Sequence, residues 1–193
     1  MPKISIVVTG VIASGKSTVC NYLKEFGAEY ISSDELAKYI INNDARVKRL
    51  IEYFFPDYGS KEFIKKIFLD SDKRHILNSI VHPFVLGYLR EYNSSSEVLV
   101  IEIPLYVEVR AWDIGDLVIA TYASKEILLE RIIKKWHTTL EEAKERLASQ
   151  LGQEVKLRFA NYRIDTSISF EYTKEQTRKV WEDLCICSFG KKT

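Results

Sequence analysis

The residues best suited to chemistry lie at 10–18, where the chain reads GVIASGKST. They match the pattern G-x-x-x-x-G-K-S/T completely, with an apolar run before them and a helical pattern after them. The two glycines let backbone N–H groups converge on a phosphate, and the following helix adds the positive end of its dipole. The stretch therefore predicts a nucleoside-triphosphate site, and a chance match in a turn is the plainer alternative.

The same loop predicts which side chains contact the nucleotide. Lys16 provides a point charge for the β- and γ-phosphates, and the Ser17 hydroxyl is a suitable ligand for Mg²⁺. The residues that we expect to bind the nucleotide are Ala13, Ser14, Gly15, Lys16, Ser17, Thr18 and Arg131.

Two acids lie at or just after the ends of predicted strands, at the sheet edge where we expect the loop. Asp34 begins a helix after the strand at 29–32, where it could orient an acceptor hydroxyl, take its proton or help to hold the metal. Its alternative role is that of a helix N-terminal carboxylate. Glu102 ends an apolar strand and is predicted to be a metal ligand near the phosphates, although an acid at this place could also face solvent.

Basic residues gather in a predicted helical pair at 124–151. In small P-loop kinases, a helical lid carries arginines that stabilise charge on the transferred phosphoryl group. Arg131 and Arg146 are our candidates for that role. The alternative is a solvated basic face, since Glu142 lies four residues before Arg146 and could form an ordinary surface ion pair with it.

The apolar pattern predicts a parallel α/β sheet interrupted by a helical segment. Strand signals occur at 4–9, 29–32, 98–103, 116–121 and 162–165. Several of these runs are nearly continuous and β-branched, as is typical of strands that helices cover on both faces.

Helices are predicted at 17–26, 33–41, 45–54, 60–68, 71–80 and 83–92. Pro83 is expected in the first turn of the last of these helices. Ser124 is predicted to cap a helix whose apolar stripe is Leu129, Ile132, Ile133 and Trp136. A capping box at 139–142 starts a helix that is predicted to continue past Gln150, and Thr173 is predicted to cap the final helix.

Composition limits the function classes. The 193 residues suffice for one compact α/β domain with small insertions, and 28 basic against 27 acidic residues give no global field that would attract nucleic acid. The 3 cysteines lack metal-site spacing, which favours a reducing cytosol. We see no signal sequence and no apolar run of membrane-spanning length, so we expect a soluble, cytoplasmic protein without a membrane or nucleic-acid partner.

Taken together, the motifs resemble those of the dephospho-coenzyme A kinase family over nearly the whole chain. The resemblance rests on their order and spacing. The matching stretches are TGVIASGKST at 9–18, ISSDELA at 31–37, VHP at 81–83, EIPLYVE at 102–108, the pattern from Arg131 through 141–143 to Arg146 and Gln150, and ANYRID at 160–165.

The resemblance implies transfer of the ATP γ-phosphoryl group, with Mg²⁺, to the ribose 3′-hydroxyl of dephospho-coenzyme A. It implies catalytic roles for Lys16, Asp34 and Arg146, and acceptor binding by Asp34, His82, Pro83 and Glu102. The implied fold is a P-loop NTPase core at 1–41, 95–122 and 159–193, with a helical acceptor-binding insertion at 42–94 and a helical lid at 123–158.

The chain departs from the family pattern at several places. Ser32 stands where the family has the first of two aspartates, and Glu102 stands where it has a shorter acid. Val11 and Ala13 replace common loop glycines. Lys135 and Leu86 replace expected arginines, and Lys135 keeps the charge while losing bidentate geometry.

Two other functions remain open from the sequence. The first is an ATP-dependent kinase of another small acceptor, such as a nucleoside, a nucleotide or a shikimate-like alcohol. The second is a catalytically inactive nucleotide-binding regulatory protein, which is considered because the chain departs from the family pattern at several residues. The oligomeric state is left open as well.

Overall fold

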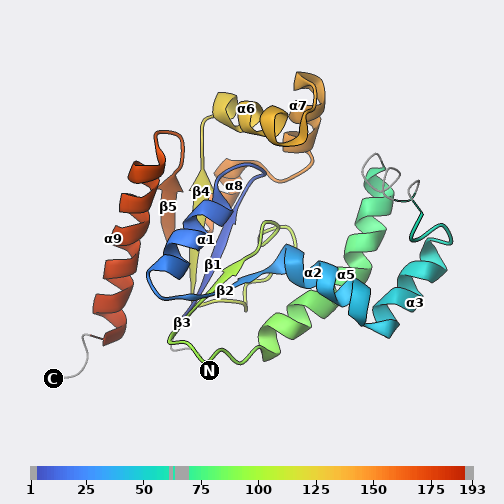
Figure 1. The fold of residues 1–193 in the computed structure, drawn as a ribbon, viewed down its shortest axis with the longest axis horizontal. Coiled ribbons are helices and arrows are strands. Elements are labelled where there is room, and N and C mark those ends of the chain that lie inside the picture. Colours follow the sequence, from blue (N-terminus) through green and yellow to red (C-terminus); the bar gives the residue numbers. More distant parts are fainter. Residues whose placement is uncertain (1–3, 61–62, 64–69, 190–193) are drawn as a thin grey trace. The chain divides into compact units, whose positions relative to one another are not determined.

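A computed structural model describes residues 4–60, 63 and 70–189 of the chain (Figure 1). Their contacts divide the chain into two compact units. The sheet unit comprises the described residues of Met1–Ser32 and Asn93–Thr193, and the helical unit comprises those of Ser33–Tyr92. None of the described helices combines the length and the apolar character that crossing a membrane requires.

The sheet unit is built on a five-stranded sheet in the order β2-β3-β1-β4-β5. Its strands are β1 (Ile4–Gly10), β2 (Glu29–Ser32), β3 (Val98–Glu102), β4 (Leu117–Tyr122) and β5 (Tyr162–Asp165). Each neighbouring pair is parallel, which confirms the predicted parallel sheet. Because β3 lies between β1 and β2, Glu102, which ends β3, pairs with Val8 of β1 and with Ser32 at the end of β2.

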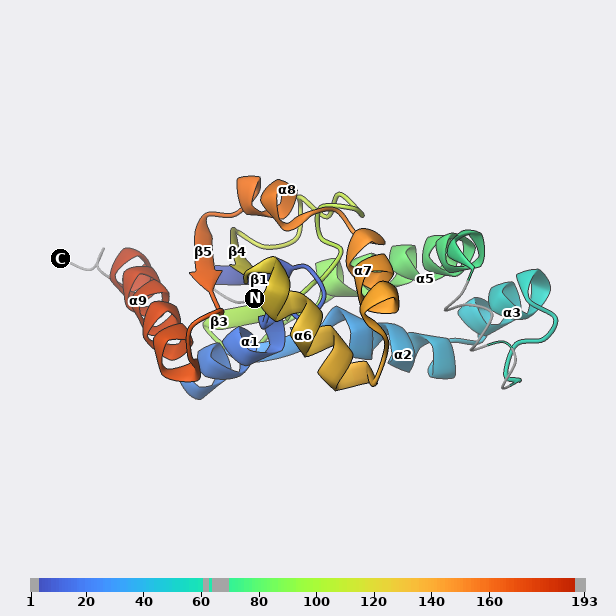
Figure 2. The same ribbon diagram turned by 90° about the horizontal axis from the view of Figure 1, so that it is seen from above.

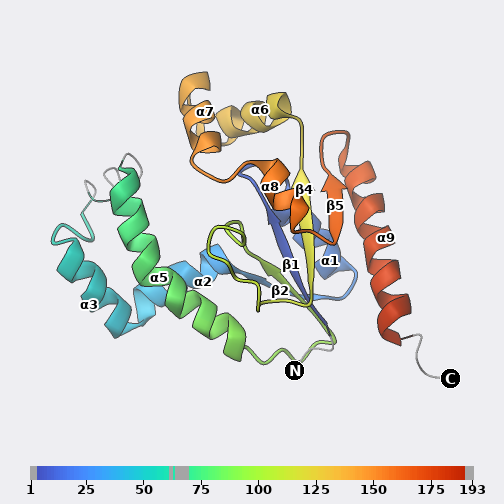
Figure 3. The same cartoon turned by 180° about the vertical axis from the view of Figure 1, so that it is seen from behind.

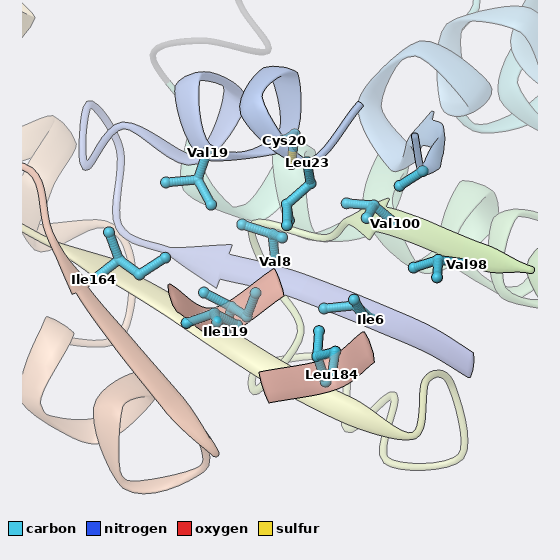
Figure 4. Close-up of a cluster of buried hydrophobic side chains, with 12 residues drawn as sticks. Ile6, Val8, Val19, Cys20, Leu23, Val98, Val100, Ile119, Ile164 and Leu184 are labelled. Atoms are coloured by element: carbon cyan, nitrogen blue, oxygen red, sulfur yellow. The ribbon is translucent and has the colours of Figure 1, made fainter. Parts of the chain in front are cut away.

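The core of this unit explains the apolar strands. Helix α1 (Lys16–Glu25) and helix α9 (Phe170–Phe189) pack on one face of the sheet, where Ile6 and Val8 meet Leu23 and Leu184 (Figure 4). Helix α8 (Gln153–Arg158) packs against β1 and β4 on the opposite face (Figure 3). Strands covered on both sides need apolar residues at nearly every position.

Helix α1 follows its predicted course and ends at a glycine. Gly27 has φ 114°, and the N–H groups of Gly27 and Ala28 donate to the carbonyls of Lys24 and Leu23. This pair of bonds satisfies carbonyls that the helix end would otherwise leave unpaired. The chain then turns directly into β2.

Helices α6 (Lys125–Trp136) and α7 (Leu140–Ala148) form a packed pair (Figure 2). The Ser124 cap and the capping box between Thr139 and Glu142 are both confirmed. The predicted apolar stripe is partly wrong, because Leu128 and Ile132 are the buried residues and Trp136 is 36% exposed.

The predicted continuation of α7 past Gln150 is wrong, since the helix ends at Ala148. The residues that follow make contacts outside the helix: Gln150 accepts from the Ile12 N–H at 2.9 Å, and the Leu151 N–H donates to Glu108 at 3.1 Å. These long-range bonds replace the local bonds that would extend the helix.

Helix α9 starts at Phe170, so the prediction that Thr173 caps it is wrong. The Ser169 hydroxyl accepts from the Tyr172 N–H at 3.0 Å, which is a capping bond. The Thr173 hydroxyl instead donates to the Ser169 carbonyl at 2.8 Å, from within the first turn.

The helical unit contains α2 (Ser33–Asn43), α3 (Ala45–Phe54) and α5 (Ser71–Glu91), which pack pairwise (Figure 1). By its contacts α2 belongs to this unit, whereas the sequence grouped it with the core. The predicted helix at 60–68 lies almost entirely outside the described residues.

Two predicted helices, 71–80 and 83–92, are a single helix in the structure, with Pro83 inside it. The prediction of a break was wrong. A proline removes one N–H donor from the helix, but buried apolar residues continue on both sides of it. These residues are Ile80, Val81, Val85 and Leu89.

Candidate active site

The loop between β1 and α1 depends on glycine at both ends. Gly10 has φ 150°, and a Cβ there would lie 2.5 Å from the Ser14 Oγ. Gly15 has φ 84°, and its Cβ would lie 2.9 Å from the Thr166 Cγ2. Ala13 also has a left-handed backbone, with φ 62°, although it carries a side chain. That conformation costs an alanine about 1–2 kcal/mol.

The N-terminus of α1 is suited to binding an anion. Gly15 is its N-cap and provides no side-chain hydrogen bond, and the first turn contains no acidic residue. The first N–H groups of a helix have no acceptor within the helix. Together with the dipole, these donors make the start of α1 suitable for a phosphate.

Lys16 lies over the loop that it follows. Its Nζ donates to the Gly10 carbonyl at 3.2 Å and to the Val11 carbonyl at 2.9 Å, and only 9% of the residue is exposed. The charge is therefore positioned at the loop, as a phosphate contact requires.

Ser14 anchors the loop to the sheet. Its buried hydroxyl lies 2.7 Å from the Thr121 hydroxyl on β4, and the Thr121 hydroxyl also donates to the Thr9 carbonyl at 3.3 Å. The Ser14 N–H donates to the Val11 carbonyl at 3.2 Å. Ser14 was predicted to bind the nucleotide, which stays a prediction; in the structure its hydroxyl holds the loop against β4.

The structure brings the two predicted metal ligands together. The Ser17 Oγ donates to Glu102 Oε1 at 3.0 Å, and the Tyr30 hydroxyl donates to Glu102 Oε2 at 2.6 Å. Glu102 is only 7% exposed. Its two carboxylate oxygens therefore accept hydrogen bonds from Ser17 and Tyr30 in place of water. Burial, followed by the bond to Glu102, raises the pKa of the Tyr30 phenol far above its ordinary value.

These oxygen ligands suit a magnesium ion. The described residues contain no group of three or more His, Cys, Asp or Glu side chains that could hold a metal by themselves. Mg²⁺ usually binds through one or two protein oxygens, with phosphate oxygens and water completing an octahedron. Ser17 and Glu102 fit that pattern.

Arg131 clamps the loop to the segment after β5. Its NH1 donates to the Thr166 hydroxyl at 2.9 Å and to the Ala13 carbonyl at 3.3 Å, while its NH2 donates to the Thr166 carbonyl at 2.5 Å. The Thr166 hydroxyl in turn donates to the Ser14 carbonyl at 3.0 Å. The sequence predicted Arg131 at the nucleotide but gave no sign of Thr166.

Arg146 lies apart from the loop in this structure. Its guanidinium carbon is 5.8 Å from the centre of the Trp136 ring, and the Nζ of Lys135 is 4.8 Å from the same ring. Within the described part of the chain, no hydrogen bond joins the Arg146 guanidinium to residues 10–18. From the connection that follows α7, the side chain of Gln150 reaches the loop at the Ile12 N–H.

The helical unit brings two other predicted residues near each other. Asp34 is exposed in the first turn of α2, and His82 lies on α5. Burial lowers the pKa of the His82 imidazole below its ordinary value, and the charge of Asp34 opposes that shift. Pro83 is exposed beside His82.

An ion pair between the buried Lys156 and the partly buried Glu108, which the sequence did not predict, supports the segment after β3. The Nζ of Lys156 lies 2.6 Å and 2.7 Å from the two carboxylate oxygens of Glu108 and 2.8 Å from the Pro104 carbonyl. Burial lowers the pKa of Lys156, and Glu108 opposes that effect. This pair connects α8 to the segment that follows Glu102.

The fold and the loop define the class of P-loop nucleotide-binding proteins, and the comparisons narrow the class. The model of the dephospho-CoA kinase family matches residues 4–171, so the chain belongs to this family. The resemblance found in the sequence is thereby confirmed. Membership of a kinase family implies ATP as the phosphoryl donor.

Several relatives support the assignment. The chain is 30% identical to a dephospho-CoA kinase of Listeria monocytogenes over 185 residues, covering 89% of this chain and 92% of the relative. It is 33% identical to that of Moorella thermoacetica over 194 residues, covering 93% and 91%.

Solved structures agree with the fold. A dephospho-CoA kinase from Campylobacter jejuni superposes with a TM-score of 0.59 at 27% identity, covering 93% of this chain and 96% of that one. TT1252 from Thermus thermophilus gives a TM-score of 0.79 at 24% identity, with 95% and 99% covered. A shikimate kinase from Acinetobacter baumannii gives 0.62 at 18% identity, with 98% and 96% covered; at that identity it shows the fold alone.

Proposed function

We propose that the protein transfers the γ-phosphoryl group of ATP to the ribose 3′-hydroxyl of dephospho-coenzyme A in the cytoplasm, as the last step of coenzyme A biosynthesis. A bond forms between the 3′-oxygen and the γ-phosphorus, the bond from that phosphorus to the bridging oxygen of ADP breaks, and the hydroxyl proton passes to the Asp34 carboxylate and on to water. The observation that carries this proposal is the Ser17–Glu102 pair at 3.0 Å, beside the loop that Lys16 covers, in a chain of this family.

On the donor side, the backbone N–H groups at the start of α1 would bind the phosphates. Lys16 would move its ammonium from the loop carbonyls to the β- and γ-phosphates, because those anions are stronger acceptors. Ser17 and Glu102 would hold Mg²⁺, which when bound neutralises charge on the β- and γ-oxygens.

On the acceptor side, Asp34 would accept a hydrogen bond from the 3′-hydroxyl and orient it. His82, with its lowered pKa, is neutral near pH 7 and can contribute an uncharged hydrogen bond to the acceptor, beside Pro83. Phosphoryl transfer has a loose transition state, so orientation should matter more than strong base chemistry.

Arg131 and Arg146 would add positive charge near the transferred group. Arg131 already bonds the Ala13 carbonyl of the loop. Arg146 rests on Trp136, a contact worth about 0.5–1 kcal/mol at an exposed site. That contact is weak enough for a phosphate to replace it, which is consistent with a lid formed by α6 and α7.

An Asp34→Asn variant tests the acceptor side. We expect its turnover with dephospho-coenzyme A to fall by about 10²-fold or more, because an amide cannot take or orient the proton as a carboxylate does. Binding of ATP, measured by calorimetry, should stay unchanged. Full turnover with an unaltered pH dependence would contradict the role of Asp34.

An acceptor panel separates this function from the alternatives. ADP release would be followed with dephospho-coenzyme A, shikimate, a nucleoside and a nucleotide, at fixed ATP and Mg²⁺. We expect release with dephospho-coenzyme A. Release only with another acceptor favours a different small-molecule kinase, and tight ATP binding without any release favours a regulatory protein.

A further inference from the structure

Tyr30 and Glu102 are placed on one face of the sheet by the register of β2 and β3. Ser32 pairs with Glu102, and Tyr30 pairs with Val100. Because side chains alternate along a strand, Tyr30 and Ser32 project on the same side as Glu102. This is the side that α1 covers, since Val100 packs against residues of that helix.

The carboxylate of Glu102 is held from two directions. Ser17, on α1, donates to Oε1 at 3.0 Å, and Tyr30, on β2, donates to Oε2 at 2.6 Å. A hydrogen bond from the Ser32 side chain acts to lower the pKa of the Tyr30 phenol, against the larger effect of burial. Two donors on separate elements leave a buried carboxylate one orientation that satisfies both of its oxygens.

A glutamate needs such support more than an aspartate does. Its side chain has one additional rotatable bond, so more rotamers must be excluded before its oxygens are fixed. A metal ligand held loosely binds its ion weakly, and residues behind a ligand commonly fix its orientation. Tyr30 is bonded to the oxygen that Ser17 does not use.

We propose that Tyr30 is a positioning residue, whose hydroxyl holds Oε2 of Glu102 so that Oε1 faces the metal–nucleotide site together with Ser17. The inference rests on the role of Glu102 given under the proposed function. Tyr30 would act only through Glu102 and would contact neither the nucleotide nor the acceptor.

The test measures how strongly Mg²⁺ tightens nucleotide binding. The β,γ-imido analogue of ATP would be titrated into the protein by calorimetry, once with Mg²⁺ and once with EDTA. We expect Tyr30→Phe to weaken binding with Mg²⁺ by about 10-fold. This is the lower end of the loss in metal affinity that follows when a residue supporting a metal ligand is replaced. Binding in EDTA should change by less than about twofold, since the phosphate contacts stay intact.

Tyr22→Phe is the matched control. It removes a hydroxyl that donates to the Phe170 carbonyl at 3.3 Å in the same unit, away from Glu102. We expect it to change neither titration. If Tyr30→Phe does not fold, Ser32→Ala gives a second measurement, because it removes the bond to the phenol, and it should weaken only the binding with Mg²⁺.

Glu102→Gln, alone and combined with Tyr30→Phe, separates the possible failures. If Tyr30→Phe weakens binding with Mg²⁺, Glu102→Gln removes the effect of Mg²⁺, and the double variant equals Glu102→Gln, Tyr30 acts through Glu102 as proposed. If Glu102→Gln removes the effect but Tyr30→Phe or Ser32→Ala does not weaken it, the inference is overturned and the proposed function stands. If Glu102→Gln has no effect, the metal role of Glu102 fails, and the inference fails with it.

Discussion

At the residue scale, the shape of the phosphate loop depends on where side chains are missing. Gly10 and Gly15 both have positive φ, and a Cβ on either would meet atoms closer than 3.0 Å. The bonds from Lys16, Ser14 and Arg131 then fix the carbonyls and hydroxyls of the loop. The chain's own groups thus hold the loop in its shape.

We predict that Gly10→Ala destabilises the protein more than Gly27→Ala does. Both positions have positive φ, but a Cβ at Gly27 meets nothing within 4 Å, whereas at Gly10 it would lie 2.6 Å from the Thr121 carbonyl oxygen. Crowding of this kind costs about 1–3 kcal/mol beyond the backbone strain that both variants share. Urea denaturation of the two variants measures the difference, and equal free energies of unfolding would contradict the tight packing of the loop.

His82 gives a prediction about pH. Its pKa is lowered in the folded protein by burial, so the unfolded chain takes up the proton first as the pH falls. The stability that neutral His82 contributes is therefore complete above the ordinary pKa of about 6.5 and is lost as the pH falls below it. A His82→Gln variant should lose less stability than the wild type between about pH 7.5 and 5.5.

Urea denaturation at both pH values would check the expectation for His82. His137→Asn, which changes an exposed histidine of the sheet unit, is the control variant, and the wild type gives the reference pH dependence. If the stability of His82→Gln follows the wild-type pH dependence, burial does not disfavour the charged form of His82.

At the scale of elements, the long-range bonds set where helices end and which strands meet. The segment after α7 leaves the helix because Gln150 bonds the loop and Leu151 bonds Glu108. Lys156, which is fully buried on α8, forms an ion pair with the same Glu108 carboxylate. A lysine is rarely buried without a charged partner.

We predict that Lys156→Met destabilises the protein by about 1–3 kcal/mol, because it leaves the partly buried Glu108 carboxylate without its charged partner. The combination of Lys156→Met with Glu108→Gln should be less damaging than the single change. It removes both charges, and the glutamine keeps an acceptor for the Leu151 N–H. Thermal melting would compare the two, and a double variant less stable than the single one would contradict this account.

Local patterns predicted many elements of the fold, and long-range pairing accounts for what they missed. Ser124, Thr139 and Glu142 marked helix starts through caps that act within a few residues. The meeting of Ser17 with Glu102 was also predictable, because parallel strands end at one edge of the sheet. Tyr30 was missed because its role depends on β2 lying beside β3, which no local pattern reveals.

At the scale of the whole molecule, the chain divides the predicted chemistry between two compact units. The sheet unit contains the residues proposed for the phosphates and the metal, and the helical unit contains Asp34, His82 and Pro83, which are proposed for the acceptor. Sequence alone grouped α2 with the core, because a helix that follows a strand is usually read as part of the sheet layer. The division by contacts assigns Asp34 to the helical unit.

The central claim is that this site phosphorylates dephospho-coenzyme A with ATP, and product analysis tests it most directly. The purified protein would be incubated with ATP, Mg²⁺ and dephospho-coenzyme A, and the products identified by mass spectrometry, with Lys16→Ala as the comparison. We predict equimolar coenzyme A and ADP from the wild type, and a rate at least about 10²-fold lower from Lys16→Ala, because a charge that stabilises the transition state is lost. The absence of coenzyme A from the wild-type reaction, or an equal rate from Lys16→Ala, would contradict the account.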